Sequence, residues 1–313
     1  SIGWQMLGLG LTFLIMILGV TKGIEKMNKL MMPVFFIFFI ILLVRVATLQ
    51  GALDGYRYLL VPNWEQLGNI KTWVYALGQA FFSLSLAGSG TIVYGSYLKK
   101  DIDVVGCAKN VAFFDTCAAL LAGMVVIPAV FAFSGGNPET LQAGPSLMFI
   151  TLPKIFATMG VGTGAGILFF LLVLLAALTS AVSLMETSVS TFMDELHWGR
   201  AKCCIIMAVI MLVFGSASSM GYGILDFLKI FGMNFLDFFD FMTNSVMMPL
   251  AALATCFLVT RVVGYDRIAA EIEQSSRFRR KGLYKFFIRY LAPVCLIIVL
   301  LSSIANVLGI ISM

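Results

Sequence analysis

Residues 163–192 read TGAGILFFLLVLLAALTSAVSLMETSVSTF and carry a single charged side chain, that of Glu186. A helix needs about 20 mostly apolar residues to cross the hydrocarbon core of a bilayer, so this stretch predicts a transmembrane helix. Comparable windows recur about eight times along the chain, at residues 3–20, 32–49, 73–97, 105–133, 163–192, 202–219, 233–260 and 286–311.

The composition of the whole chain agrees with a membrane protein and excludes several other classes. Of its 313 residues, 60% are hydrophobic and 12% are charged, and the mean hydropathy is +0.98. A soluble protein of this length cannot bury that much apolar surface in one core, and disordered chains are polar and highly charged instead. The net charge of +5 is small, and we expect no nucleic-acid partner. The sequence predicts an all-α, polytopic membrane protein with about eight transmembrane helices.

Residue patterns typical of catalysis or of metal centres do not occur in the sequence. The six cysteines form no CxxC pair with metal-ligand spacing, and His197 is the single histidine. There is no Ser-His-Asp set, no HExxH motif and no pair of catalytic carboxylates. We therefore expect that the protein is not an enzyme.

Basic residues alternate between the loops and predict their orientation. One set of loops carries fifteen: Lys22, Lys26, Lys29, Lys99, Lys100, Lys109, Arg200, Lys202, Arg261, Arg267, Arg277, Arg279, Arg280, Lys281 and Lys285. The other loops and span ends carry five: Arg45, Arg57, Lys71, Lys154 and Lys229. Because lysine and arginine mark cytoplasmic loops, we expect the richer set inside and residue 1 outside, with the basic run at residues 277–281 against anionic membrane lipids. An outside N-terminus suggests that an odd number of helices precedes Ser1; a short protein that inserts Ser1 by itself is the alternative.

Two spans contain groups that suggest ion or ligand binding. In the third, four small residues at positions 87–90 interrupt the apolar run, and a break at bilayer depth is tolerated where the freed backbone groups line a cavity or bind a ligand. A small-residue packing face is the alternative. In the fifth, the Ala176 carbonyl and the hydroxyls of Thr179 and Ser180 are suitable oxygen ligands for a small cation; bonding of both hydroxyls to the preceding turn is the alternative.

Other candidates are acids inside apolar runs and a pair of helix-weakening residues. Asp115 and Glu186 lie within spans, where acids are costly and indicate function by default, and Asp240 lies at the end of one. Gly23 and Pro33 bracket the start of the second span, so the segment between them is a candidate gate, although proline is also a common first-turn residue.

Several motifs in the same order resemble the neurotransmitter:sodium symporter family, most closely its bacterial amino-acid transporters. They are KGIEK at 22–26, the spacing from Gly23 to Pro33, GQAFFSLSL at 78–86, GPSLMFITLP at 144–153 and LTSA at 178–181. The resemblance implies that the chain corresponds to transmembrane helices 4 to 11 of a fold with two inverted five-helix repeats, and that the preceding helices of the same transporter are its partner. The implied organisation is residues 1–49 as the last two helices of the first repeat, 50–72 as an extracellular loop, 73–260 as the second repeat with a lid loop at 134–160, 261–285 as a basic cytoplasmic loop and 286–313 as an additional helix.

The resemblance also implies site residues. Sodium ligands would be Ser83, Asp115, Ala176, Thr179 and Ser180, with no chloride requirement, because Ala118 stands where chloride-dependent relatives carry serine. The substrate pocket would include Phe82, Ser83, Ser85, Ala87, Gly88, Ser180 and Leu184. Gating residues would be Gly23, Pro33, Tyr97, Asp194 and Asp240.

The resemblance further implies sodium-coupled symport of an amino acid across the plasma membrane by alternating access. Gly88 enlarges the pocket, so a large apolar or aromatic amino acid is expected. A truncated, non-transporting scaffold or remnant is the alternative, and a channel is a second rival.

Overall fold

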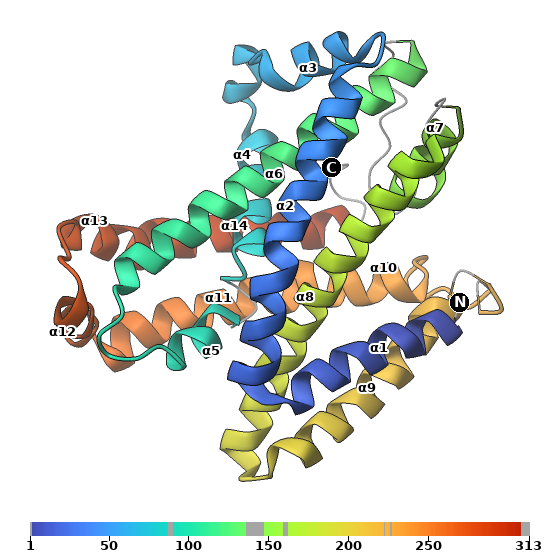
Figure 1. Cartoon of the computed structure of the whole chain (residues 1–313). Helices are drawn as coiled ribbons and strands as arrows, with labels where there is room; N and C mark the ends of the chain where they lie inside the picture. The colour runs from blue at the N-terminus through green and yellow to red at the C-terminus, as the bar shows by residue number, and fades with distance from the viewer. Residues whose placement is uncertain are drawn as a thin grey trace. The chain divides into compact units, whose positions relative to one another are not determined.

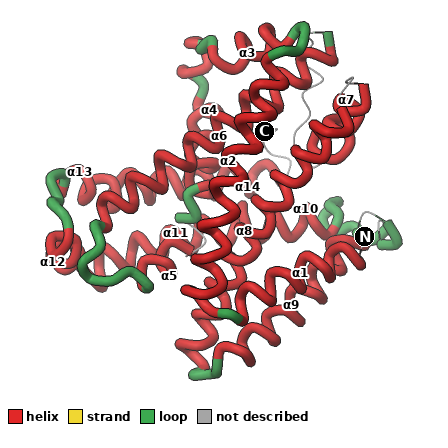
Figure 2. The backbone as a smooth tube through the Cα atoms, viewed as in Figure 1, coloured by secondary structure: helices red, strands yellow, loops and turns green. Residues whose placement is uncertain are grey.

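The computed structural model describes residues 2–86, 90–135, 147–158, 162–221, 223–225 and 227–307. Figure 2 shows that these residues are almost entirely helical. Extended pairing among them is limited to one isolated bridge between Ile230 and Met233. The prediction of an all-α fold is confirmed.

The chain forms the following elements. The α-helices are α1 (Ile2–Ile17), α2 (Lys26–Ala47), α3 (Ala52–Leu60), α4 (Ile70–Ser83), α5 (Gly90–Ser96), α6 (Val104–Ser134), α7 (Leu152–Thr158), α8 (Gly162–Leu196), α9 (Arg200–Met220), α10 (Phe235–Asp240), α11 (Met248–Phe257), α12 (Tyr265–Ser275), α13 (Lys281–Phe286) and α14 (Ala292–Val307). Wider π-helical turns are η1 (Val20–Glu25), η4 (Leu147–Thr151), η5 (Phe241–Met247), η6 (Leu258–Val263) and η7 (Phe287–Leu291), and η2 (Trp64–Gly68) is a 3₁₀ turn.

Among the described residues, six continuous helices are long and apolar enough to cross a membrane: Val20–Ala47, Val104–Ser134, Gly162–Leu196, Arg200–Met220, Phe235–Val263 and Lys281–Asn306. Two of the expected eight spans take another form. The first, expected at residues 3–20, is the 16-residue helix α1. The third, expected at residues 73–97, is divided into α4 and α5.

The connections expected between spans contain short helices. The 50–72 connection carries α3 and η2, the 134–160 connection carries η4 and α7, and the basic 261–285 connection carries η6, α12 and the start of α13. Residues 136–146, 159 and 160 of the expected lid lie outside the described part.

The helices group into two compact units, each described on its own. The first unit comprises Ser1–Ile17, Glu65–Ala112 and Ser183–Met313. In it α1 packs along α9 (Figure 1), and α14 packs against both α4 and α11. The small core between α4, α11 and α14 centres on Ala252 and Leu296, with Phe81, Met248, Leu253 and Cys256 around it.

The second unit comprises Leu18–Trp64 and Phe113–Val182. Its core is contributed by α2, α6, α7 and α8: Phe39, Leu42, Val46, Val125, Ala129, Val130, Leu152, Ile155, Phe156, Ala165, Phe169 and Leu172. Helix α3 lies so close to α6 that a Cβ atom at Gly55 would stand 2.5 Å from the Cα of Pro128. Only glycine fits at this approach without a shift of the backbone.

Candidate functional site

The third expected span is interrupted. Helix α4 ends at Ser83, α5 begins at Gly90, and Ser85 between them has a left-handed backbone with φ 52°. A non-glycine residue in this region is uncommon and often marks a functional or strained segment. The break was expected at residues 87–90; Ala87, Gly88 and Ser89 lie outside the described residues, and the helix already ends four residues earlier than Ala87. A packing stripe would need a continuous helix, so the described part of this span favours the break over the packing face.

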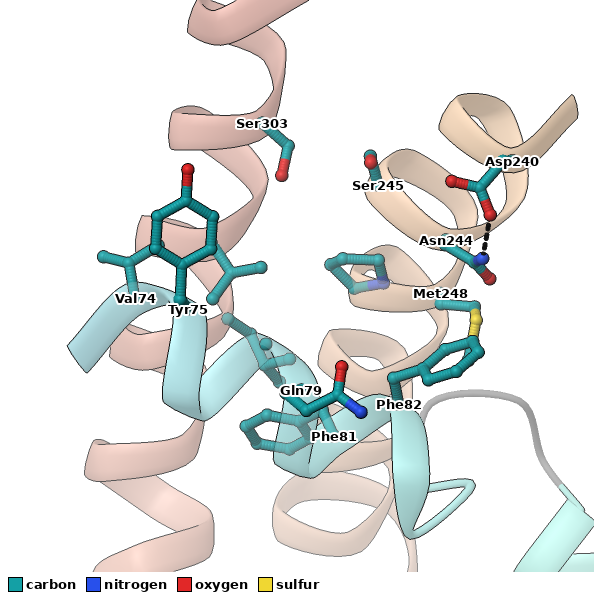
Figure 3. A pocket seen from close by; sticks show the side chains of 14 residues that line it. Val74, Tyr75, Gln79, Phe81, Phe82, Asp240, Asn244, Ser245, Met248 and Ser303 are labelled. Atoms are coloured by element: carbon teal, nitrogen blue, oxygen red, sulfur yellow. Dashed lines mark hydrogen bonds between the residues drawn. The ribbon is translucent and has the colours of Figure 1, made fainter. Parts of the chain in front are cut away.

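A cavity of about 480 Å³ lies beside α4 within the first unit. Figure 3 shows it between side chains of α4, of the η5–α11 segment and of α14. Phe82 and Asp240, expected in the substrate pocket and in the outer gate, line the same cavity. Asn244 Nδ2 donates a hydrogen bond of 2.5 Å to Asp240 Oδ1, which orients the carboxylate. The cavity lining therefore brings one expected substrate residue and one expected gate residue together.

A second polar cluster in the first unit is built on α8. Glu186 is completely buried, with 0% of its surface exposed. Arg200, the first residue of α9, donates from Nη2 to Oε2 at 2.6 Å and from Nη1 to Oε1 at 3.1 Å. Tyr97, just after α5, donates its hydroxyl to Oε1 at 2.6 Å. An isolated buried carboxylate is very costly, and these donors compensate its charge.

The same arginine joins a third helix to the cluster. Arg200 Nε donates to the carbonyl oxygen of Met16 at the end of α1, at 3.0 Å. One turn before Tyr97, Tyr94 donates its hydroxyl to Ser183 of α8 at 3.0 Å. The C-terminal ends of α1 and α5 and the start of α9 are thus held together by hydrogen bonds, in which α8 takes part through Ser183 and Glu186.

Part of this cluster is indicated by the sequence. Glu186 stood out as an acid at membrane depth and Tyr97 as an expected gate residue, whereas Arg200 was counted only as a loop charge. The signal for Arg200 was available, because a buried acid needs a cationic partner and Arg200 is a nearby basic residue. Asp194, expected to gate together with Tyr97, is exposed near the end of α8 and has no ion pair with the described residues.

The candidate cation ligands of α8 lie in the second unit. Thr179 is 8% exposed, and its hydroxyl donates to the carbonyl of Ala176 at 2.9 Å. For Thr179 this is the bonding to the preceding turn given above as the alternative for both hydroxyls; Ser180 is exposed. The other expected sodium pair, Ser83 and Asp115, belongs to different units, each described separately.

The remaining expected residues lie as follows. Leu184 is 65% exposed on α8. Gly23 is buried in η1, and Pro33 is the eighth residue of α2. Pro33 is therefore inside the helix, and the first-turn explanation of this proline does not describe it.

The chain combines apolar spans, one interrupted helix and a buried ion-pair cluster. These features define a polytopic membrane protein that holds polar groups where lipid offers no hydrogen-bond partner, as membrane transporters do. The chain belongs to the sodium:neurotransmitter symporter family, whose family model matches residues 1–310. The resemblance seen in the sequence motifs is thereby confirmed.

Individual relatives agree with this assignment. The uncharacterized sodium-dependent transporter YhdH of Bacillus subtilis is 35% identical over 310 residues, which cover 98% of this chain and 67% of the relative. An uncharacterized sodium-dependent transporter of Haemophilus influenzae is 29% identical over 93% of this chain and 63% of its own. The crystal structure of MhsT in complex with L-phenylalanine matches with a TM-score of 0.84 and 37% identity, covering 96% of this chain and 68% of that chain. The chain thus spans about two thirds of the length of these proteins.

Proposed function

We propose that the chain forms part of a sodium-coupled symporter that carries an amino acid across the plasma membrane by alternating access. The observation that carries this proposal is the interruption of an apolar span between Ser83 and Gly90 in a member of a sodium symporter family. Backbone groups freed within a span need an ion, a substrate or a cavity, and Phe82, next to the last residue of α4, lines a cavity.

Two sodium sites are proposed. One would use Ser83 and Asp115, and the other the carbonyl of Ala176 with the hydroxyls of Thr179 and Ser180. Hard oxygen ligands suit a hard cation such as sodium, and Asp115 would contribute a carboxylate oxygen. In the second site, the Thr179 hydroxyl would keep the 2.9 Å hydrogen bond that it donates to the Ala176 carbonyl. Its oxygen would then offer a lone pair to the ion. Because Ala118 carries no hydroxyl, transport should not require chloride.

The proposed substrate is a large apolar or aromatic amino acid. Phe82 is 50% exposed and can stack on an aromatic ring. Ser83, Ser85, Ser180 and Leu184 would complete the pocket, together with Ala87 and Gly88, which leave room for a bulky side chain. MhsT, the structural relative, was crystallised with L-phenylalanine, which supports the same substrate class here.

Gating is proposed at three places. Asp240 would belong to the outer gate. Tyr97, together with Glu186 and Arg200, would belong to the cytoplasmic gate, with Asp194 nearby on the same helix. The segment from Gly23 to Pro33 would unwind to let sodium leave on the cytoplasmic side. Basic loops would then face the cytoplasm and residue 1 the outside.

Uptake by proteoliposomes tests the proposal. Two proteins are compared, the 313-residue chain and the product of the whole reading frame that encodes it, with a sodium gradient, with potassium in its place, and with gluconate replacing chloride. We expect at least the product of the whole reading frame to take up labelled phenylalanine. This uptake should depend on sodium and should not change when gluconate replaces chloride. No uptake by either would favour the scaffold, and sodium current without amino-acid uptake would favour the channel.

Competition and one substitution sharpen the test. Glycine and alanine should displace label less well than tryptophan, tyrosine or leucine, because each buried CH₂ lost costs about 0.8 kcal/mol, or roughly fourfold in affinity. Asp115→Ala should abolish sodium-stimulated substrate binding, whereas Asp237→Ala, which removes an acid outside the proposed sites, should not. Unchanged sodium affinity in Asp115→Ala would remove this residue from the site.

A further inference from the structure

A basic cavity in the first unit is not used by the proposed transport mechanism. Its volume is about 520 Å³, and it lies where the connection between α12 and α13 meets the start of α6. Four cationic side chains line it, Lys109, Arg277, Arg279 and Arg280, together with one carboxylate, Asp103. None of the four cations forms an ion pair with the described residues. The cavity therefore offers an excess of positive charge to an anion.

Local contacts hold the arginine segment in place. The hydroxyl of Ser276 donates to Asp103 Oδ1 across the cavity rim, and the same carboxylate oxygen accepts the N–H of Gly106 at 2.9 Å. The ring of Phe278 packs edge-on against Tyr284, with centroids 5.3 Å apart. The arginines at 277, 279 and 280 thus extend from a segment fixed at both ends, so little order has to be created when an anion binds.

The single acid in the cavity offsets only part of the charge of the four cations, and Lys109 is a cation whose charge it feels. Hydrogen bonds from Ser276, first, and from the backbone of Gly106 hold the pKa of the Asp103 carboxyl below its ordinary value. Asp103 therefore stays a carboxylate whose oxygen is occupied by these donors. Lys281, the next basic residue along the chain, is paired with Glu273 at 2.7 Å and does not line the cavity. Four cations against one carboxylate leave a net positive charge for a ligand, and arginine forks match phosphate oxygens particularly well.

The position of the cavity along the chain favours a lipid head group as the source of an anionic phosphate ligand. The candidate span Lys281–Asn306 begins directly after the arginine segment. Its first two turns expose Leu283, Phe286 and Phe287, which suit acyl chains, and arginines directly before such a span would lie at the level of the head groups.

We propose that the cavity lined by Lys109, Arg277, Arg279 and Arg280 binds the phosphate head group of an anionic phospholipid. The chemistry recognised is a phosphate, and the lipid is preferred over free phosphate because the apolar side chains lie beside the cations. Bound lipid would tie the α6 start to the α12–α13 connection, in addition to the Ser276–Asp103 hydrogen bond.

Binding of labelled phosphatidylglycerol to the purified 313-residue chain in zwitterionic detergent tests the proposal. The triple variant Arg277→Gln, Arg279→Gln, Arg280→Gln should bind on the order of 100-fold more weakly, because a basic residue at the membrane surface contributes about fivefold in affinity. The triple variant with lysine at the same positions should keep most of the affinity. A matched control, Lys99→Gln, Lys100→Gln, Arg267→Gln, removes the same charge from exposed positions outside the cavity and should stay within about threefold of the parent chain.

The outcomes separate the alternatives. An equal loss of lipid affinity in the triple cavity variant and in the matched control would mean that the lipid is attracted to positive charge in general. This result would overturn the site. Displacement of the lipid by inorganic phosphate, but not by sodium chloride at the same ionic strength, would assign the cavity to free phosphate and overturn the lipid assignment. If the triple glutamine variant does not fold, the single variants Arg277→Gln and Arg279→Gln replace it. Each should lose about fivefold, and unchanged binding in both would contradict the proposal.

Discussion

Glu186 and Arg200 form a two-pronged ion pair across a helix boundary: Nη2 lies 2.6 Å from Oε2 and Nη1 lies 3.1 Å from Oε1, although fourteen residues separate them. The carboxylate is fully buried and the arginine largely so. In such a pair the cost of desolvation is offset only while both partners are present. Tyr97 donates a further hydrogen bond to Glu186, and the carbonyl of Met16 accepts one from Arg200. Loss of the ion pair would therefore affect three neighbouring elements at once.

Arg200→Gln should therefore destabilise the protein strongly. It leaves the buried Glu186 carboxylate without a cation, a change that costs about 3–5 kcal/mol in comparable pairs. Thermal unfolding in detergent measures the loss. The double variant with Glu186→Gln should recover part of it, because no buried charge remains. Lys202→Gln is the matched control on α9: its ammonium lies 3.9 Å from the Trp198 ring centroid, a contact worth about 0.5–1 kcal/mol. A double variant no more stable than Arg200→Gln would refute the explanation by an unpaired charge.

Tyr97→Phe tests the hydroxyl that completes the cluster. The substitution removes a 2.6 Å hydrogen bond to a carboxylate, and hydrogen bonds to charged groups contribute about 1.5–3 kcal/mol. If Tyr97 belongs to the cytoplasmic gate, the loss should increase the share of molecules open to the cytoplasm, measured by the labelling rate of a cysteine introduced there. Tyr94→Phe, which removes a 3.0 Å bond to the uncharged Ser183, should have a smaller effect. Equal labelling in both variants would contradict a special role for Tyr97.

The sequence predicted most of the fold because membrane spans follow from apolar length alone, and α6, α8 and α9 lie where the apolar windows are. It also predicted an interrupted third span. The exact end of α4 could not be predicted, because Ser83 and Leu84 are no worse as helix formers than their neighbours. The helix ends where Ser85 adopts a left-handed backbone and the N–H of Leu86 bonds back to the carbonyl of Phe81 at 3.3 Å, as in a Schellman cap, a position that glycine usually occupies.

The ion-pair cluster shows the same limit. A sequence indicates that Glu186 needs a partner but not which cation supplies it, since the choice depends on where the turn after α8 places the first residue of α9. For the same reason the sequence places Tyr97 among the expected gate residues without indicating its hydrogen bond to Glu186. Local patterns, such as the turn from Ala176 to Thr179, were predictable because both residues belong to one helix.

Gly55→Ala tests the close approach of α3 and α6 in the second unit. A Cβ at this position would meet backbone, the Cα of Pro128, at 2.5 Å. Because backbone cannot rotate away, the substitution should cost about 1–3 kcal/mol through overpacking, measured as a lower unfolding temperature in detergent. Gly68→Ala is the control, since nothing lies within 4 Å of a Cβ there. Equal unfolding temperatures for the two variants would mean that α3 moves freely from α6.

The helix from Val20 to Ala47 contains two features that weaken its first turns. Its N-terminal part, η1, has the wider π-helical geometry around Gly23 and follows Gly19 with φ 85°. Pro33 lies inside α2, and without an N–H it cannot donate the hydrogen bond that the Lys29 carbonyl would otherwise accept. Both features lower the cost of unwinding the turns between Gly23 and Pro33.

Pro33→Ala should restore the missing donor and strengthen these turns by about 3 kcal/mol, the penalty of an interior proline. If the segment unwinds to release sodium, transport by the complete protein should slow, while sodium-dependent binding of labelled substrate remains nearly unchanged. Met32→Ala alters the neighbouring position without adding a donor and should transport at the parent rate. The two measurements distinguish the possibilities, because a variant with intact binding and slow uptake has lost a conformational step. A Pro33→Ala protein that transports as fast as its parent would show that this proline shapes the helix without contributing to release.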